Sequence, residues 1–220
     1  MSSICRRFHR SVLTARPTDR IYLSILHPRL FAELISYEPM IGDFGREAAL
    51  FAYYASRKLD RWKSLAAAHE YFRSTTPYKA WDERVIERWM AHGVQRSKNP
   101  PLLSDAEVRL STPTHQEAIT YGQPVFGDVQ QSFTCPGAST VMLLLPSLVT
   151  PLACVFGSRS TLLTSSKRVA ILKSAGSGQG GGGGQLRGQV IESVVEGAGH
   201  LLTFEVVDKC ADVALSLIHI

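Results

Sequence analysis

His200 stands where a catalytic base could face a pocket. The segment VVEGAGHLLTFE carries β-branched residues up to Val195, then the small residues 197–199, and then the histidine. A loop of small residues directly after a buried strand leaves an imidazole uncovered by bulky neighbours, which suits proton transfer. A single histidine on a loop is also commonly a solvated surface residue, so the spacing alone leaves both interpretations open.

Two further patterns have residue types that occur in cofactor or metal sites. The string GSGQGG, residues 176–181, has the spacing of a dinucleotide-binding motif, but it follows a predicted helix and precedes a predicted strand, the reverse of the required order. No Gly-Lys-Ser/Thr follows it, which excludes a phosphate loop. The seven histidines are scattered, and His115 with Glu117 is the closest pairing. We therefore predict no cofactor and no metal.

The elements that would position His200 alternate between strand and helix. Apolar and helical periodicities predict strands at 151–156 and 189–195 and helices at 161–173 and 204–217. Seven glycines within residues 176–184 predict a flexible loop between them, because glycine loses the most backbone entropy on ordering. This βαβα order predicts an α/β fold class for the C-terminal half.

A helix, a strand and a helical insertion precede that half. The segment IYLSILHP predicts a helix that stops before Pro28, and Phe31–Tyr37 predicts a buried strand. Residues 43–99 carry three amphipathic patterns, and the last follows Asp82, a residue type favoured at helix N-caps. These patterns predict an inserted helical cap. Residues 102–131 are mixed, with a strand at 108–111 and a short helix at 115–121. The insertion contains Trp62, Trp81 and Trp89, which could line an apolar pocket, although aromatic residues on helical faces more often form a core.

Composition excludes several classes of protein. With 220 residues, 45% of them hydrophobic and 20% charged, the chain is neither disordered nor a coiled coil. Its net charge of +5 is dilute, and basic residues alternate with acidic ones along the predicted helices, which argues against nucleic-acid binding. Prolines interrupt the longest uncharged stretch, 129–158, so no membrane span is predicted. Four widely spaced cysteines indicate a reducing compartment, and we expect the cytoplasm.

Four segments together resemble a known family: YLSILHPRLFAELISYEP, YKAWDERVIERWMAHGV, PLACVFGSRS and EGAGHLLTFE. They are similar to the second half of an α/β-hydrolase, in particular to fungal toxin-biosynthesis hydrolases related to the AK-toxin cluster enzyme. The resemblance extends over residues 21–217 and implies the C-terminal part of an α/β-hydrolase sheet with an inserted helical cap. The predicted organisation is an atypical basic N-terminal segment, a core helix and strand, a helical cap and a C-terminal α/β core, at residues 1–20, 21–41, 42–100 and 101–220.

The resemblance implies roles for two residues. The family order is nucleophile, acid and histidine, and His200 matches the histidine. The acid usually follows the strand PLACVF, where this chain has Ser158 and Ser160. In a variant of the fold the acid ends the preceding core strand, where Glu38 stands, and there it would hold the imidazole tautomer and stabilise the imidazolium. Asp43 is the alternative acid.

The nucleophile is missing from the expected place. No G-x-S-x-G occurs in the 220 residues. Counting back from the first helix reaches Thr14, but Val12 and Arg16 replace the glycines that a strained elbow needs, so Thr14 is rejected. We expect the chain to lack the front half of the hydrolase, and a gene model whose true start lies upstream is one explanation left open.

Two functions follow as hypotheses. The first is an α/β-hydrolase of fungal secondary metabolite (toxin) biosynthesis, which hydrolyses an ester or thioester of an apolar acyl or polyketide-like intermediate. The second is a catalytically inactive remnant or interaction subunit, whose exposed half-sheet predicts self-association. Because the serine nucleophile is missing, the sequence predicts that the chain expressed alone shows no esterase or thioesterase turnover above background. The family resemblance implies the peroxisome as the alternative compartment.

Overall fold

The computed structural model describes residues 9–13, 17–96, 107–124, 133–134 and 136–218. The chain divides into two compact units, one formed by Met1–Asp43 with Pro136–Ile220 and the other by Phe44–Cys135. We call them the sheet unit and the helical unit. The helical unit extends to Cys135, beyond the boundary at residue 100 that the sequence pattern predicts.

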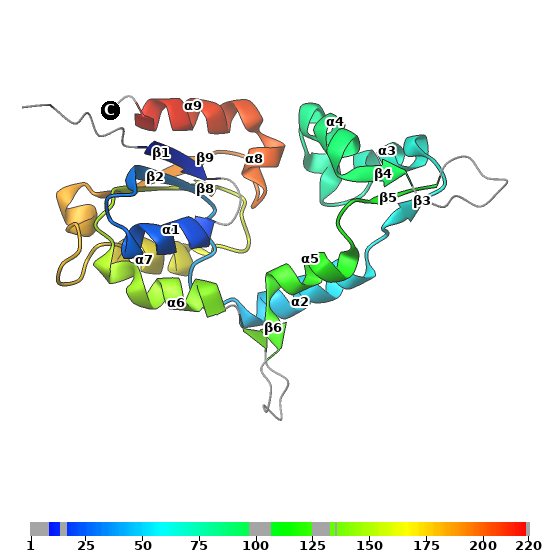
Figure 1. Ribbon diagram of the computed structural model, residues 1–220. Helices are drawn as coiled ribbons and strands as arrows, with labels where there is room; N and C mark the ends of the chain where they lie inside the picture. The colour runs from blue at the N-terminus through cyan, green and yellow to red at the C-terminus, as the bar shows by residue number, and fades with distance from the viewer. Residues whose placement is uncertain (1–8, 14–16, 97–106, 125–132, 135, 219–220) are drawn as a thin grey trace, which may run out of the picture. The chain divides into compact units, whose positions relative to one another are not determined.

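Four parallel strands in the order β1-β2-β8-β9 form the sheet unit (Figure 1). They are β1 (His9–Leu13), β2 (Phe31–Tyr37), β8 (Leu152–Gly157) and β9 (Val190–Val195). Every residue of β8 is buried, as expected for a central strand of a parallel sheet that is covered on both faces. Tyr37 pairs with Val155, and Gly157 pairs with Val195, so β2, β8 and β9 end at the same edge of the sheet.

Helices cover both faces of this sheet (Figure 1). One face carries α9 (Val207–Ile218), and the other carries α1 (Pro17–Leu26), α6 (Pro136–Leu144) and α7 (Ser165–Ser174). Shorter helical segments complete the unit: η2 (Leu145–Ser147), η3 (Gly184–Arg187) and α8 (Leu202–Glu205). The helix expected over 204–217 is two helices, because the backbone leaves the helical region at Val206. Among the described residues no helix has the length and apolar character needed to cross a membrane.

The sheet includes residues that the sequence pattern set apart as a basic N-terminal segment. β1 runs parallel to β2, with His9 opposite Phe31 and Leu13 opposite Ser36. The segment 1–20 therefore supplies an edge strand and the first turn of α1. A strand of five residues that contains His9 and Arg10 shows too little apolar periodicity to be recognised from sequence. Thr14 lies outside the described residues.

The glycine-rich loop, residues 176–184, is held in place rather than free, which corrects the expectation of flexibility. Three of its backbone N–H groups donate to carbonyl oxygens of the η2 region, each at 2.9 Å: Gly176 to Leu145, Gly178 to Pro146 and Gly182 to Leu148. The two backbones approach closely because no side chain intervenes. A Cβ atom at Gly181 would lie 2.4 Å from the Pro146 carbonyl oxygen. Glycine serves here as a packing residue.

The helical unit combines helices with short antiparallel strands. Its elements are α2 (Gly45–Arg57), β3 (Arg61–Trp62), α3 (Leu65–Ser74), η1 (Tyr78–Ala80), α4 (Glu83–His92), β4 (Val94–Arg96), β5 (Val108–Leu110), α5 (Thr114–Tyr121), β6 (Gln123–Pro124) and β7 (Phe133–Thr134). Asp82 caps α4 as predicted, because its Oδ1 accepts the Arg84 backbone N–H at 2.9 Å. The strands form a sheet of order β3-β5-β4 and a separate pair, β6-β7.

An aromatic cluster forms the core of the helical unit. Phe72 is 1% exposed, and its ring centroid lies 5.3 Å from that of Trp62, 4.8 Å from Tyr78 and 6.0 Å from Trp89. Trp62 is therefore a buried core residue, and the partly buried Trp81 and Trp89 pack against each other and against the same cluster. Elsewhere in the unit, Phe51 of α2 packs against Tyr121 of α5 with centroids 5.6 Å apart. This contact explains why the unit continues beyond residue 100.

Raising the pH should remove a stabilising contact of the sheet unit. The buried Tyr37 hydroxyl donates to the Cys210 carbonyl oxygen at 2.6 Å, and burial raises the pKa of Tyr37 to about 12. An unfolded tyrosine has a pKa of about 10, so this stability is fully present below about pH 10 and is lost as the pH rises towards 12.

We expect the wild-type chain to be more stable than Tyr37→Phe at about pH 9 and to lose that advantage by about pH 11. Urea unfolding at both pH values measures the difference in the free energy of unfolding between the two chains. The titration of the other tyrosines contributes equally to both chains and cancels in this difference. An advantage that stays constant between the two pH values would contradict the expectation.

Candidate active site

His200 and Glu38 meet although 162 positions separate them in the chain. The imidazole Nδ1 lies 2.8 Å from Glu38 Oε2, and the two side chains are 28% and 3% exposed. Their contact follows from the sheet, because Glu38 directly follows β2 and His200 lies in the loop after β9, at the edge where both strands end. The structure thus contains the convergence that the sequence predicts, while the catalytic role of both residues stays a prediction.

The Glu38 carboxylate has a partner on each oxygen. The Gly157 backbone N–H donates to Oε1 at 2.7 Å, and the Ser160 hydroxyl donates to Oε2 at 2.6 Å. Glu38 has a φ of 47°, in the left-handed region that costs a non-glycine residue about 1–3 kcal/mol. Its backbone N–H donates to the Val155 carbonyl oxygen at 2.8 Å, which helps to hold this conformation. Asp43, the alternative acid, is exposed.

The loop that carries His200 is fixed by two side chains. The Gly197 N–H donates to Ser158 Oγ at 2.9 Å, and the Gly199 N–H donates to Glu205 Oε2 at 2.7 Å. Glu205 belongs to α8, so the loop is bound both to the turn after β8 and to the helix that follows. Sequence reasoning noted Ser158 only as a residue at the usual acid position and missed Glu205, since neither bond follows from a local pattern.

This geometry suits transfer of a proton by His200. When Nδ1 donates to the carboxylate, Nε2 is left to take a proton from an attacking oxygen and return it to a leaving group. Glu38 then holds the ring and stabilises the imidazolium. The carboxylate is buried and has three hydrogen-bond partners, so its position is set before any substrate arrives.

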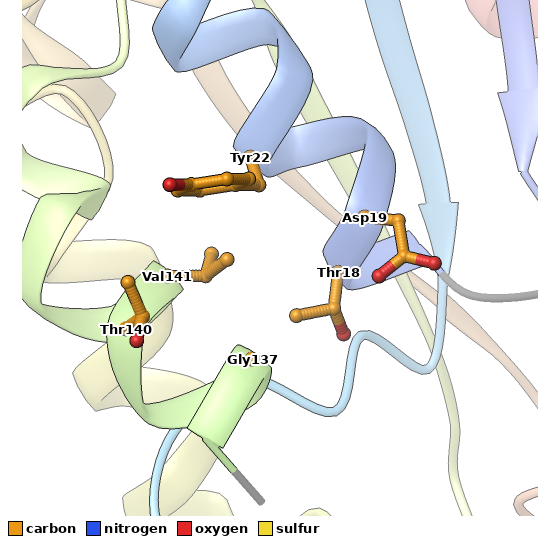
Figure 2. Close-up of a pocket in the computed structure, with 6 residues that line it drawn as sticks. All are labelled: Thr18, Asp19, Tyr22, Gly137, Thr140 and Val141. Carbon is orange, nitrogen blue, oxygen red and sulfur yellow. The ribbon is translucent and has the colours of Figure 1, made fainter. Parts of the chain in front are cut away.

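A pocket of about 230 Å³ lies in the sheet unit between α1 and α6 (Figure 2). Six residues line it: Thr18, Asp19, Tyr22, Gly137, Thr140 and Val141. Neither His200 nor Glu38 is among them, and Thr18 Oγ1 already donates to the Met40 carbonyl oxygen. The pocket therefore adds no reactive group to the site.

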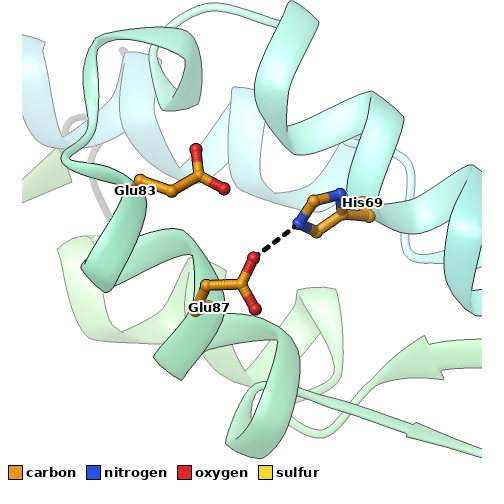
Figure 3. A group of neighbouring side chains, drawn as sticks. All are labelled: His69, Glu83 and Glu87. Carbon is orange, nitrogen blue, oxygen red and sulfur yellow. Dashed lines mark hydrogen bonds and ion pairs between the residues drawn. The ribbon is translucent and has the colours of Figure 1, made fainter.

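The structure also gathers three ligand-type side chains that sequence analysis missed (Figure 3). One ligand atom each from His69, Glu83 and Glu87 lies within 4.8 Å of the others, on α3 and α4. His69 Nε2 lies 3.0 Å from Glu87 Oε1, and Arg73 forms an ion pair with Glu83. The i, i+4 spacing of the glutamates was the available signal. Because both carboxylates are exposed and already paired, we interpret the group as surface ion pairs, in keeping with the alternating charges of these helices.

The parallel strand order, the helices on both faces and the histidine after the last described strand are those of an α/β-hydrolase fold, and the chain is similar in sequence and in fold to known α/β-hydrolases. No family model matches the chain. An abhydrolase domain-containing protein of Alternaria alternata is 28% identical over 201 residues, which cover 87% of this chain and 75% of the relative. A type I acyl-CoA thioesterase of Penicillium roqueforti is 26% identical over 226 residues, covering 83% and 52%.

Among solved structures, the peroxisomal alpha-beta-hydrolase of Saccharomyces cerevisiae matches with a TM-score of 0.68 and 15% sequence identity. The match covers 92% of this chain and 50% of that hydrolase, so this chain spans about half of its length. At this identity the likeness establishes the fold alone.

Proposed function

We propose that this chain hydrolyses an ester or thioester of an apolar acyl intermediate in fungal secondary metabolism. The observation that carries the proposal is the 2.8 Å contact between His200 Nδ1 and the buried Glu38 Oε2, at the edge where the strands end. In the proposed reaction, His200 takes a proton from a water molecule whose oxygen attacks the acyl carbonyl. It passes that proton to the leaving oxygen or sulfur as the bond from this atom to the acyl carbon breaks, which releases the free acid. Glu38 orients the ring and balances its positive charge.

Two findings support the substrate class. Relatives of this chain include proteins named as an acyl-CoA thioesterase and as abhydrolase domain-containing proteins, and thioester and ester hydrolysis share one proton-transfer scheme. The helical unit exposes large apolar side chains on α2 and α5, among them Leu50, Tyr53, Tyr54 and Ile119. Exposed apolar surface of this kind commonly contacts an apolar ligand or partner.

A non-catalytic role as an interaction subunit is the second candidate. The absence of G-x-S-x-G from the 220 residues favours it, because the family's covalent step needs a serine in that turn. The same exposed apolar side chains would then contact another protein or a second copy of this chain.

A substrate panel separates the two functions. The purified full chain is incubated with p-nitrophenyl esters of increasing acyl length and with acyl-CoA thioesters, and product release is followed by absorbance. The hydrolytic proposal predicts turnover that increases with the apolar length of the acyl group, whereas a chain that depends on the missing serine shows none. A chain that shows dispersed amide NMR signals yet leaves every substrate intact would overturn the hydrolytic proposal, and association at micromolar concentration in sedimentation would then support the interaction subunit.

A further inference from the structure

Ser160 shares one carboxylate oxygen with His200. The Ser160 hydroxyl donates to Glu38 Oε2 at 2.6 Å, and His200 Nδ1 lies 2.8 Å from the same oxygen. A carboxylate oxygen has two lone pairs, so one can accept from the hydroxyl while the other accepts from the imidazole. The Gly157 N–H occupies Oε1, and therefore the carboxylate cannot rotate without losing a bond.

The backbone aims the Ser160 hydroxyl at this oxygen. The Ser160 N–H donates to the Gly157 carbonyl oxygen at 3.1 Å, which closes a tight turn after β8. The same carbonyl accepts from Arg168 Nη2 at 2.6 Å, and the Arg168 guanidinium lies over the Phe156 ring, 5.0 Å from its centroid. The turn that presents the hydroxyl is thus fixed from α7 as well as from β8.

We propose that Ser160 is a positioning residue that acts through Glu38 to keep Oε2 on the imidazole Nδ1. This inference rests on the proposed function of the His200–Glu38 pair and adds a third member to it. A glutamate side chain has three rotatable bonds. The Gly157 N–H binds Oε1, which is not the oxygen that contacts the imidazole. Ser160 supplies the bond that sets the orientation of the oxygen facing His200.

The first test is spectroscopic and does not depend on turnover. In the full chain labelled with ¹⁵N-histidine, a strong bond to a carboxylate shifts the His200 Nδ1 proton far downfield and slows its exchange with water. We expect this resonance in the wild type and in Ser160→Thr, which keeps the hydroxyl. It should move upfield and exchange at least about tenfold faster in Ser160→Ala, because one hydrogen bond to a charged group is lost. His200→Ala assigns the signal, and the exposed Ser216→Ala is the matched control.

The second test is kinetic. Ser160→Ala should lower kcat about tenfold with an unchanged KM, whereas Ser160→Thr should keep most of kcat. If the wild type lacks the downfield proton, the His200–Glu38 pair is wrong and both proposals fail. If the wild type has it and Ser160→Ala keeps the same shift and exchange rate, only the positioning role is overturned. Loss of the signal in Ser160→Thr as well would show that the shape of the side chain matters rather than its hydroxyl, which also overturns the role.

Discussion

The Gly157→Ala variant should unfold with a free energy lower by about 3 kcal/mol or more, because the added methyl group has no space. A Cβ atom at Gly157 would lie 2.3 Å from the Gly199 carbonyl oxygen and 2.6 Å from that of Ala198. Both neighbours are backbone atoms of the loop that carries His200, so they cannot turn aside as a flexible side chain would. The loop must move away from β8, and the bond from the Gly157 N–H to Glu38 is strained with it.

Gly137→Ala is the matched control for this change. Nothing lies within 4 Å of a Cβ atom at Gly137, which belongs to α6, so the same substitution should be neutral or stabilise the helix by about 0.5–1 kcal/mol. Urea unfolding of the two variants beside the wild type gives the comparison. Equal stability of Gly157→Ala and the wild type would mean that the His200 loop does not pack against the end of β8 as described.

The His200→Ala variant should lower kcat for the ester or thioester that the chain hydrolyses best by about 10²–10⁴, the range for a general acid–base group. The other described partners of Glu38 are the Gly157 N–H and the Ser160 hydroxyl, and neither is a base that could replace the imidazole near neutral pH. Glu38→Gln should cause a loss of similar order, since an amide can no longer hold the required tautomer or balance the imidazolium charge. Steady-state rates measure both losses.

The exposed His27→Ala variant, in the same unit, is the control for His200→Ala and should keep the wild-type rate. If His200→Ala keeps the rate within about twofold, the contact with Glu38 is structural and the turnover belongs to another site. The double variant His200→Ala/Glu38→Gln should lose no more than His200→Ala alone, because residues that act as a unit are not additive.

The sequence predicted the central strands and most helices because their patterns are long and unmixed. The run FAELISY is β2, the run PLACVF lies in β8 except for Pro151, and Asp82 caps α4 as its type and position indicate. The edge strand β1 was missed because its five residues show no clear period, and a single helix was expected where Val206 divides two. The high glycine content predicted a flexible loop at residues 176–184. In the structure the absence of side chains instead lets this backbone pack closely against its neighbour, and hydrogen bonds hold it there.

Only the part of the site that has a local sequence signal was predictable. A histidine after a strand and a loop of small residues is a local signal, and Glu38 entered through the resemblance to a hydrolase variant. The bonds from Ser160 and Gly157 to Glu38, and from Gly199 to Glu205, depend on three-dimensional register, which no local spacing encodes. The group of His69 with two glutamates was missed in the same way, because it needs two packed helices.

The shared oxygen of Glu38 has an evolutionary consequence. Glu38 follows β2 and Ser160 follows β8, two neighbouring strands, yet both side chains end within hydrogen-bond distance of one point beside the imidazole. An aspartate arising at position 160 would place a second carboxylate at that point while Glu38 was still present. A lineage could then lose the older acid without passing through a form whose histidine has no partner. Adjacent parallel strands thus offer a continuous route by which the acid of such a site can change its place in the chain.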